Sequence, residues 1–136
     1  MQIHLKKGEK FYVNGAIIRA EHRCSIELLN NVNFLLESHV MRQERADTPI
    51  KQIYFTVQTM LISPEDASTA RESYWRLSDS LHSTIQVPLL IKALLISDSC
   101  VKNHKYFDAL KILRDQFDVD DTSLRAKSNK QKETRV

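Results

Sequence analysis

The chain has 136 residues, of which 42% are hydrophobic and 27% are charged, so its composition excludes an intrinsically disordered protein and fits one domain or two small modules. Lys and Arg exceed Asp and Glu by 20 to 17, which gives a formal net charge of +3. No apolar run approaches the roughly 20 residues that a membrane-spanning helix needs, and the N-terminus lacks the pattern of a secretory signal. We therefore expect a cytoplasmic protein with no membrane partner.

Residues 1–45 are predicted to form a β-rich module, because apolar and polar residues alternate there with a period of two. The strongest local signal is Asn14-Gly15, a dipeptide that accepts the positive φ angles of a tight hairpin turn. Alternating segments on both sides of this turn and further along the chain predict an antiparallel β-meander of about five strands. An open meander has free edges, so pairing of edge strands into a homodimer stays open at this stage.

Residues 46–121 are predicted to form an α-helical module, a bundle of about four helices. The period of the apolar pattern changes to about 3.6 residues at its start, where Thr48 is the expected N-cap and Pro49 the first helical residue. Residues 63–66 are expected to end this helix and to open the next. Residues 89–96 are apolar nearly all round, which predicts a central helix surrounded by its neighbours. The predicted fold class is therefore α+β.

Residues 122–136 are predicted to form a disordered basic tail, because Ser, Asn, Lys and Gln replace the apolar residues there. From residue 125 onward the chain has five basic residues and one acid, whereas residues 1–124 carry 15 basic and 16 acidic side chains. The net positive charge of the chain is therefore concentrated in this tail.

Three blocks of sequence carry a family resemblance through their order and spacing. They are residues 8–18 (GEKFYVNGAII), residues 46–55 (ADTPIKQIYF) with Gln58 and Met60 following, and residues 106–114 (YFDALKILR). Together they resemble the FlbT family of flagellar regulators in alphaproteobacteria, over all of the chain except the tail.

The resemblance to the FlbT family implies a post-transcriptional regulator of flagellin synthesis. Such a regulator associates with the 5′ untranslated region of flagellin mRNA and influences its translation or degradation during flagellum assembly. The resemblance also implies counterbalance by the small protein FlaF, so a FlaF-like protein is an expected partner. The sequence leaves open whether the effect is repression or activation.

The sequence shows no catalytic signature and no cofactor site, so we expect a protein that is not an enzyme. Two glycines cannot build a Gly-rich phosphate loop, and no Ser or Cys lies in a nucleophile elbow. His22 and Cys24 share one face of a predicted strand, but a metal site needs three or four ligands and the other histidines are scattered. No metal is therefore predicted. Cys24 and Cys100 lie far apart in the sequence, and both are expected to be buried thiols.

Candidate RNA contacts lie around two turns of the β-rich module. Cations contact phosphates, and an aromatic ring beside them can stack on an unpaired base. Tyr12 is the preferred stacking residue, because it points to the opposite face of the strand from Phe11. The lysines could instead solvate a sheet edge and discourage edge-to-edge pairing, and this interpretation stays open. The predicted RNA-binding residues are Lys6, Lys7, Lys10, Tyr12, Arg19 and Arg23.

The helical half has an acidic bias that would repel phosphate and suit a protein partner. Trp75 falls off the main apolar stripe of its helix, so it is the predicted anchor for such a partner. The alternative hypothesis is therefore a protein-interaction adaptor of the flagellar system, which acts on flagellin or its message only through partner proteins. The residues alone do not decide between the adaptor and the RNA-binding regulator.

Overall fold

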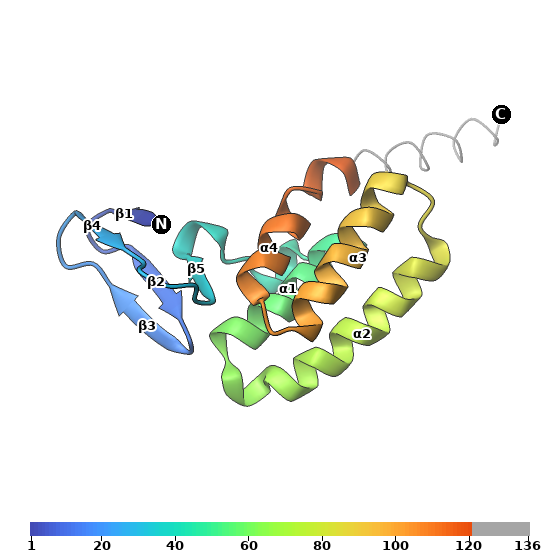
Figure 1. Cartoon of the computed structure of the whole chain (residues 1–136), viewed down its shortest axis with the longest axis horizontal. Helices are drawn as coiled ribbons and strands as arrows, with labels where there is room; N and C mark the ends of the chain where they lie inside the picture. Colours follow the sequence, from blue (N-terminus) through green and yellow to red (C-terminus); the bar gives the residue numbers. More distant parts are fainter. Residues whose placement is uncertain (121–136) are drawn as a thin grey trace.

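A computed structural model describes residues 1–120, in which five strands precede the helices α1 to α4 and a short helical segment at residues 117–120 (Figure 1). The strands lie at one end of the molecule and the helices at the other. The predicted α+β fold class is confirmed, and the predicted tail, residues 122–136, lies outside the described residues. The elements are β1 (Gln2–Leu5), β2 (Lys10–Val13), β3 (Ala16–Arg19), β4 (Cys24–Glu27), β5 (Phe34–Leu36), α1 (Pro49–Ile62), α2 (Ala67–Thr84), α3 (Pro88–Lys102) and α4 (Tyr106–Arg114).

The five strands form two small antiparallel sheets. β1 pairs with β4, and the second sheet has the strand order β3-β2-β5. The order departs from the consecutive pairing of a meander, since only β2 and β3 are neighbours both in the sequence and in a sheet. The physical reason is burial. Ile3 and Leu5 of β1 share a core with Phe11 of β2 and Phe34 of β5, so stacked sheets cover apolar faces that a single flat sheet would expose.

The hairpin between β2 and β3 turns at the predicted dipeptide. Asn14 and Gly15 have φ angles of 47° and 80°, as a two-residue hairpin turn that follows the twist of its strands requires. The tip of this hairpin lies against the junction of α1 and α2, where a Cβ atom on Gly15 would come within 2.9 Å of Pro64 Cγ. Gly15 is therefore required both by its backbone conformation and by a close approach.

Helix α1 begins where the sequence predicts and occupies the centre of the helical module. The backbone N–H of Lys51 donates to Thr48 Oγ1 (3.2 Å), and Pro49 is the first helical residue. Ile50 and Val57 are completely buried, and α1 packs against α2, α4 and β2. The helix therefore has neighbours on several sides, which explains its broad apolar surface.

The prediction that residues 89–96 form the central helix is wrong. They belong to α3, which packs closely against α4 and more loosely against α2. Leu89, Leu95 and Ile96 are 63%, 57% and 41% exposed. An apolar pattern that runs all round a helix predicts neighbours on several sides. In this chain α1 has such neighbours, and α3 leaves part of its apolar surface exposed.

The β-rich and helical modules share a packed junction. The ring of Phe34 stacks on the ring of Phe107 in α4, with 4.3 Å between the centroids. Tyr12 and Leu35 lie on the other face of the three-stranded sheet and pack against the helical core. Side chains from both faces of this sheet thus connect the two predicted modules, residues 1–45 and residues 46–121. Among residues 1–120, no helix combines the length and the apolar character that crossing a bilayer requires.

Candidate functional site

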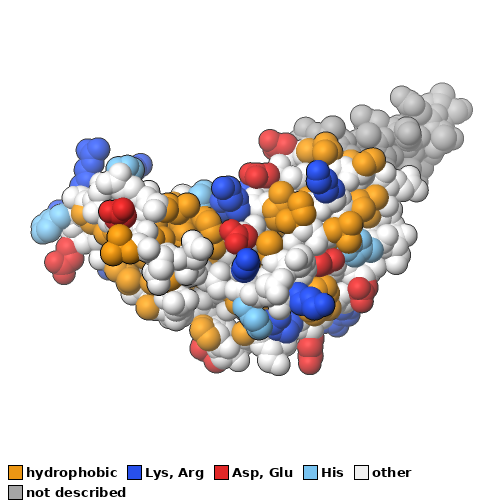
Figure 2. Space-filling view, viewed as in Figure 1, with side chains coloured by type: hydrophobic (Ala, Val, Ile, Leu, Met, Phe, Trp, Pro, Cys, Tyr) orange, Lys and Arg blue, Asp and Glu red, His pale blue; other side chains and the backbone are white. Residues whose placement is uncertain are grey.

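Five of the six predicted RNA-binding residues gather at the end of the β-rich module that points away from the helices (Figure 2). Lys10 of β2 lies directly opposite Arg19 of β3. In the other sheet Leu5 pairs with Cys24. Lys6 follows Leu5 and Arg23 precedes Cys24, so two more cations lie at the same end of that sheet. Two backbone hydrogen bonds hold the turns together: the N–H of Gly8 donates to the carbonyl of Ala20 (2.7 Å), and the N–H of Ala20 donates to the carbonyl of Glu9 (3.0 Å). This cationic end consists of Lys6, Lys7, Lys10, Arg19 and Arg23.

Cations outnumber carboxylates at the cationic end, where Glu37 Oε2 also accepts a hydrogen bond from the backbone N–H of Lys10 (2.8 Å). Segments 6–10 and 19–23 contain five cations and only two carboxylates, those of Glu9 and Glu21. None of the five cations forms an ion pair within residues 1–120. Side chains directly opposite on antiparallel strands lie about 5 Å apart at Cβ, and like charges there are destabilising. A bound anion such as a phosphate would relieve the repulsion between Lys10 and Arg19.

Tyr12 lies one pleat repeat from Lys10 on the same face of β2, in the direction of the helices. Its side chain is half-buried and packs against the helical core. The ring therefore joins the two modules. Its role in stacking on RNA stays a prediction.

Trp75, the predicted anchor for a protein partner, is half-buried on α2. Its ring meets the Tyr74 ring edge to face, with 5.0 Å between the centroids, and it packs at the border of the helical core. Part of the indole is thus committed to the fold. Its role at an interface stays a prediction.

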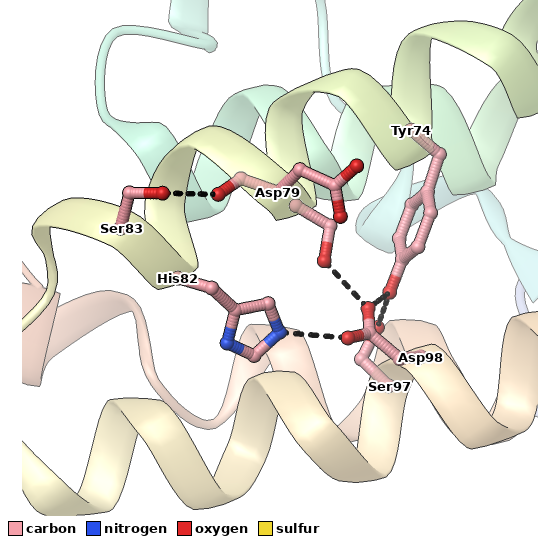
Figure 3. A network of polar contacts seen from close by, with 7 residues as sticks. Tyr74, Asp79, His82, Ser83, Ser97 and Asp98 are labelled. Atoms are coloured by element: carbon pink, nitrogen blue, oxygen red, sulfur yellow. Dashed lines mark hydrogen bonds and ion pairs between the residues drawn. The ribbon is translucent and has the colours of Figure 1, made fainter.

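A polar network that the sequence analysis missed joins α2 to α3 (Figure 3). Asp98 Oδ1 accepts hydrogen bonds from Tyr74 Oη (2.7 Å) and Ser78 Oγ (2.8 Å), and Asp98 Oδ2 lies 2.8 Å from His82 Nε2. Tyr74 Oη also lies 2.8 Å from Ser97 Oγ. Burial raises the pKa of Tyr74 well above its ordinary range, so the phenol stays protonated and donates. The network holds the two helices together although their backbones approach each other closely at only a few positions.

The order of groups in this network differs from that of a hydrolytic triad. Nucleophile activation needs a histidine between the hydroxyl and the carboxylate, so that the imidazole takes the hydroxyl proton. Here the carboxylate of Asp98 lies in the middle, and Ser78 and His82 each contact it separately. The arrangement fixes helices and does not activate Ser78. A sequence signal for it exists: Ser78 follows Tyr74 by one helical turn and interrupts the buried stripe of α2.

The described residues contain no group of three or more His, Cys, Asp or Glu side chains placed to hold a metal ion. Cys24 was expected to be buried, and this prediction is wrong, because β4 pairs only with β1 and turns most of its side chains to solvent. Cys100 is half-buried on α3, and burial is the main cause that raises the pKa of its thiol.

Comparison with known proteins places the chain in a family. A family model described as "Flagellar protein FlbT" matches residues 1–124. The probable flagellum biosynthesis repressor protein FlbT of Chelativorans sp. (strain BNC1) is 40% identical over 125 residues, which cover 92% of this chain and 86% of the relative. The protein of the same name from Mesorhizobium japonicum is 40% identical over 124 residues, or 91% and 84% of the two chains. That of Brucella anthropi is 38% identical over 117 residues, or 86% and 77%.

No solved structure matches the chain, so the family assignment rests on sequence. The match to the family model spans the strands, the helices and the hairpin and helix-start blocks described above. The chain belongs to the FlbT family of flagellar proteins.

Proposed function

We propose that this chain is a cytoplasmic, non-enzymatic regulator of flagellum biosynthesis that associates with the 5′ untranslated region of flagellin mRNA and influences its translation or degradation. Membership of the FlbT family and the name of its relatives, flagellum biosynthesis repressor, support a regulatory role. The observation that carries RNA as the ligand is the cationic end, where Lys10 and Arg19 face each other and neither side chain forms an ion pair within residues 1–120.

The cationic end is suited to the backbone of single-stranded RNA. Each cation that neutralises a phosphate of a single strand steepens the plot of log binding constant against log salt concentration by about 0.7. Five such contacts give a slope of about −3.5, which corresponds to a roughly 100-fold loss of affinity between 50 and 200 mM salt. This interaction positions the RNA, whereas the choice of a particular leader sequence needs contacts to the bases.

Lys6→Ala/Lys10→Ala is expected to make the salt slope for binding of a flagellin leader RNA shallower by about 1.4, because two phosphate contacts are removed. Fluorescence anisotropy of the labelled leader across salt concentrations measures this slope. The matched control is Lys92→Ala/Lys102→Ala, which removes two exposed lysines of α3 and should leave the slope unchanged. Lys10→Ala should not destabilise the fold, since it removes a repulsion with Arg19. Equal slopes for the two double variants would refute the cationic end as an RNA-binding surface.

The second candidate function is a protein-interaction adaptor, and the exposed apolar face of α3 favours it. Figure 2 shows hydrophobic side chains gathered over the helical half of the molecule. Leu89, Leu95 and Ile96 are the large exposed hydrophobic residues of α3, and exposed apolar side chains that gather on one surface mark interaction sites. We propose a FlaF-like protein as the partner for this face.

The adaptor hypothesis predicts that Leu95→Ser/Ile96→Ser weakens binding of a purified FlaF-like protein at least tenfold without lowering the melting temperature, because exposed side chains that fill a partner's pocket dominate binding. Isothermal titration calorimetry measures the affinity. Ile17→Ser, a change at an exposed isoleucine of β3, is the control and should leave the affinity unchanged. Trp75→Ala tests the predicted anchor in the same assay. If the α3 variant and the control have the same affinity for the FlaF-like protein, the partner does not contact α3.

A further inference from the structure

A groove with a volume of about 700 Å³ separates the loop after β4 from α4. One wall is formed by residues 28–34 and the other by residues 104–111, with Met1 beside the first wall. Pockets that bind small ligands have volumes of about 300–1,000 Å³, so the groove has room for a nucleotide. The function proposed above makes no use of it.

The two walls of the groove are fixed to each other by the hydrogen bonds of Asn33 and by a pair of stacked rings. Asn33 Nδ2 donates to the backbone carbonyl of His104 (2.8 Å), and the backbone N–H of Phe107 donates to Asn33 Oδ1 (3.2 Å). The rings of Phe34 and Phe107 stack beside these bonds, 4.3 Å apart and inclined by only 21°. The groove is therefore formed before any ligand enters, which lowers the entropic cost of binding.

The groove combines the three kinds of group that bind unpaired RNA. Lys105 and Lys111 line it with one carboxylate, that of Asp108, so cations predominate on this wall. Figure 2 shows Lys and Arg side chains next to Asp and Glu side chains at the junction between the β-rich module and the helices. Asn30 and Asn31 on the other wall are exposed, and each amide offers donors and an acceptor to a base edge.

The third kind of group is aromatic. Phe107 is half-buried, and its ring lines the groove next to Phe34, where a base can stack. Single-stranded RNA is recognised by stacking on aromatic rings, by hydrogen bonds to base edges and by cations at the phosphates. An apolar ligand would leave the asparagine amides and the lysines without partners, whereas an RNA strand provides a partner for all three kinds of group.

We infer that this groove binds one or two unpaired nucleotides of an RNA strand, with Lys105 and Lys111 at the phosphates and Asn30 and Asn31 at the base edges. The inference rests on the proposed function and extends it from charge to sequence recognition. The groove lies by the Gln2 end of β1 and the cationic end by its Leu5 end, about 10 Å apart at the rise of a strand. One strand of RNA can therefore contact both surfaces.

The test measures binding of a labelled flagellin leader RNA and of a scrambled RNA of the same composition by fluorescence anisotropy, between 50 and 200 mM salt. Lys105→Ala/Lys111→Ala is expected to make the salt slope shallower by about 1.4, whereas the control Lys92→Ala/Lys102→Ala leaves it unchanged. Asn30→Ala/Asn31→Ala is expected to keep the slope and to lower the preference for the leader over the scrambled RNA at least fivefold.

The outcomes separate this inference from the proposed function. If the wild-type protein binds neither RNA at 50 mM salt, the proposed function fails and this inference fails with it. If the wild type binds the leader and both groove variants match the α3 control, only the groove is excluded. Weaker binding of a FlaF-like protein by the asparagine variant, with RNA binding intact, assigns the groove to a peptide and overturns the inference. Circular dichroism confirms that each variant folds.

Discussion

Asp98→Ala is expected to lower the free energy of unfolding by about 3 kcal/mol. The change removes the acceptor of Tyr74 Oη and Ser78 Oγ, two residues with no solvent exposure, and the partner of His82. A buried donor left without an acceptor costs about 1–3 kcal/mol, and bonds to a charged group lie at the upper end of that range. Tyr74 keeps its contact with Ser97, which limits the loss.

Thermal denaturation followed by circular dichroism measures this effect, and the expected fall in melting temperature is roughly 10 °C for a chain of this size. Asp79→Ala is the matched control. Asp79 is exposed on the same helix, and its backbone carbonyl, which accepts from Ser83 Oγ (3.1 Å), remains after the substitution (Figure 3). Asp98→Asn keeps the shape of the side chain and one acceptor oxygen, so its free energy of unfolding should fall less than that of the alanine variant. If the Asp98→Ala and Asp79→Ala variants have the same melting temperature, the network does not hold α3 in place.

Local signals in the sequence predicted local structure correctly. Asn14-Gly15 makes the hairpin turn and Thr48-Pro49 begins α1, because positive φ angles and N-caps depend on a few adjacent residues. The pairing of β1 with β4 could not be predicted in this way. It joins residues 19 to 25 positions apart, and it depends on which sheet arrangement buries Ile3 and Phe11 together.

The candidate site also has features that local sequence predicts and features that only the tertiary structure shows. The cations of the two turns were identifiable from residue type, but the direct opposition of Lys10 and Arg19 follows from the strand register. The groove was not identifiable, because its asparagines lie more than seventy residues from Lys105 and Lys111 in the sequence. The place of α3 was mispredicted because an apolar pattern does not tell whether this chain or a partner covers each face.

Gly15→Ala is expected to lower the free energy of unfolding by about 2–3 kcal/mol, of which about 1–2 kcal/mol comes from the positive φ angle alone. The remainder arises at the tip of the β2–β3 hairpin, since the added Cβ would come within 2.9 Å of Pro64 Cγ and 3.2 Å of Pro64 Cδ. The proline ring is stiff and begins the turn between α1 and α2, so it yields less easily than the end of a flexible side chain.

Gly8→Ala separates the two causes. Gly8 has a φ angle of 81°, nearly the same as Gly15, but a Cβ atom there would meet nothing within 4 Å. Urea denaturation of both variants should therefore show a loss of about 1–2 kcal/mol for Gly8→Ala and a larger loss for Gly15→Ala. Because the two glycines share the backbone term, their difference reports the contact of the hairpin tip with the helical module. Equal losses would mean that this contact adds nothing to stability, and that the modules are joined by their other contacts, among them the Phe34–Phe107 stack, the core around Tyr12 and the hydrogen bonds of Asn33.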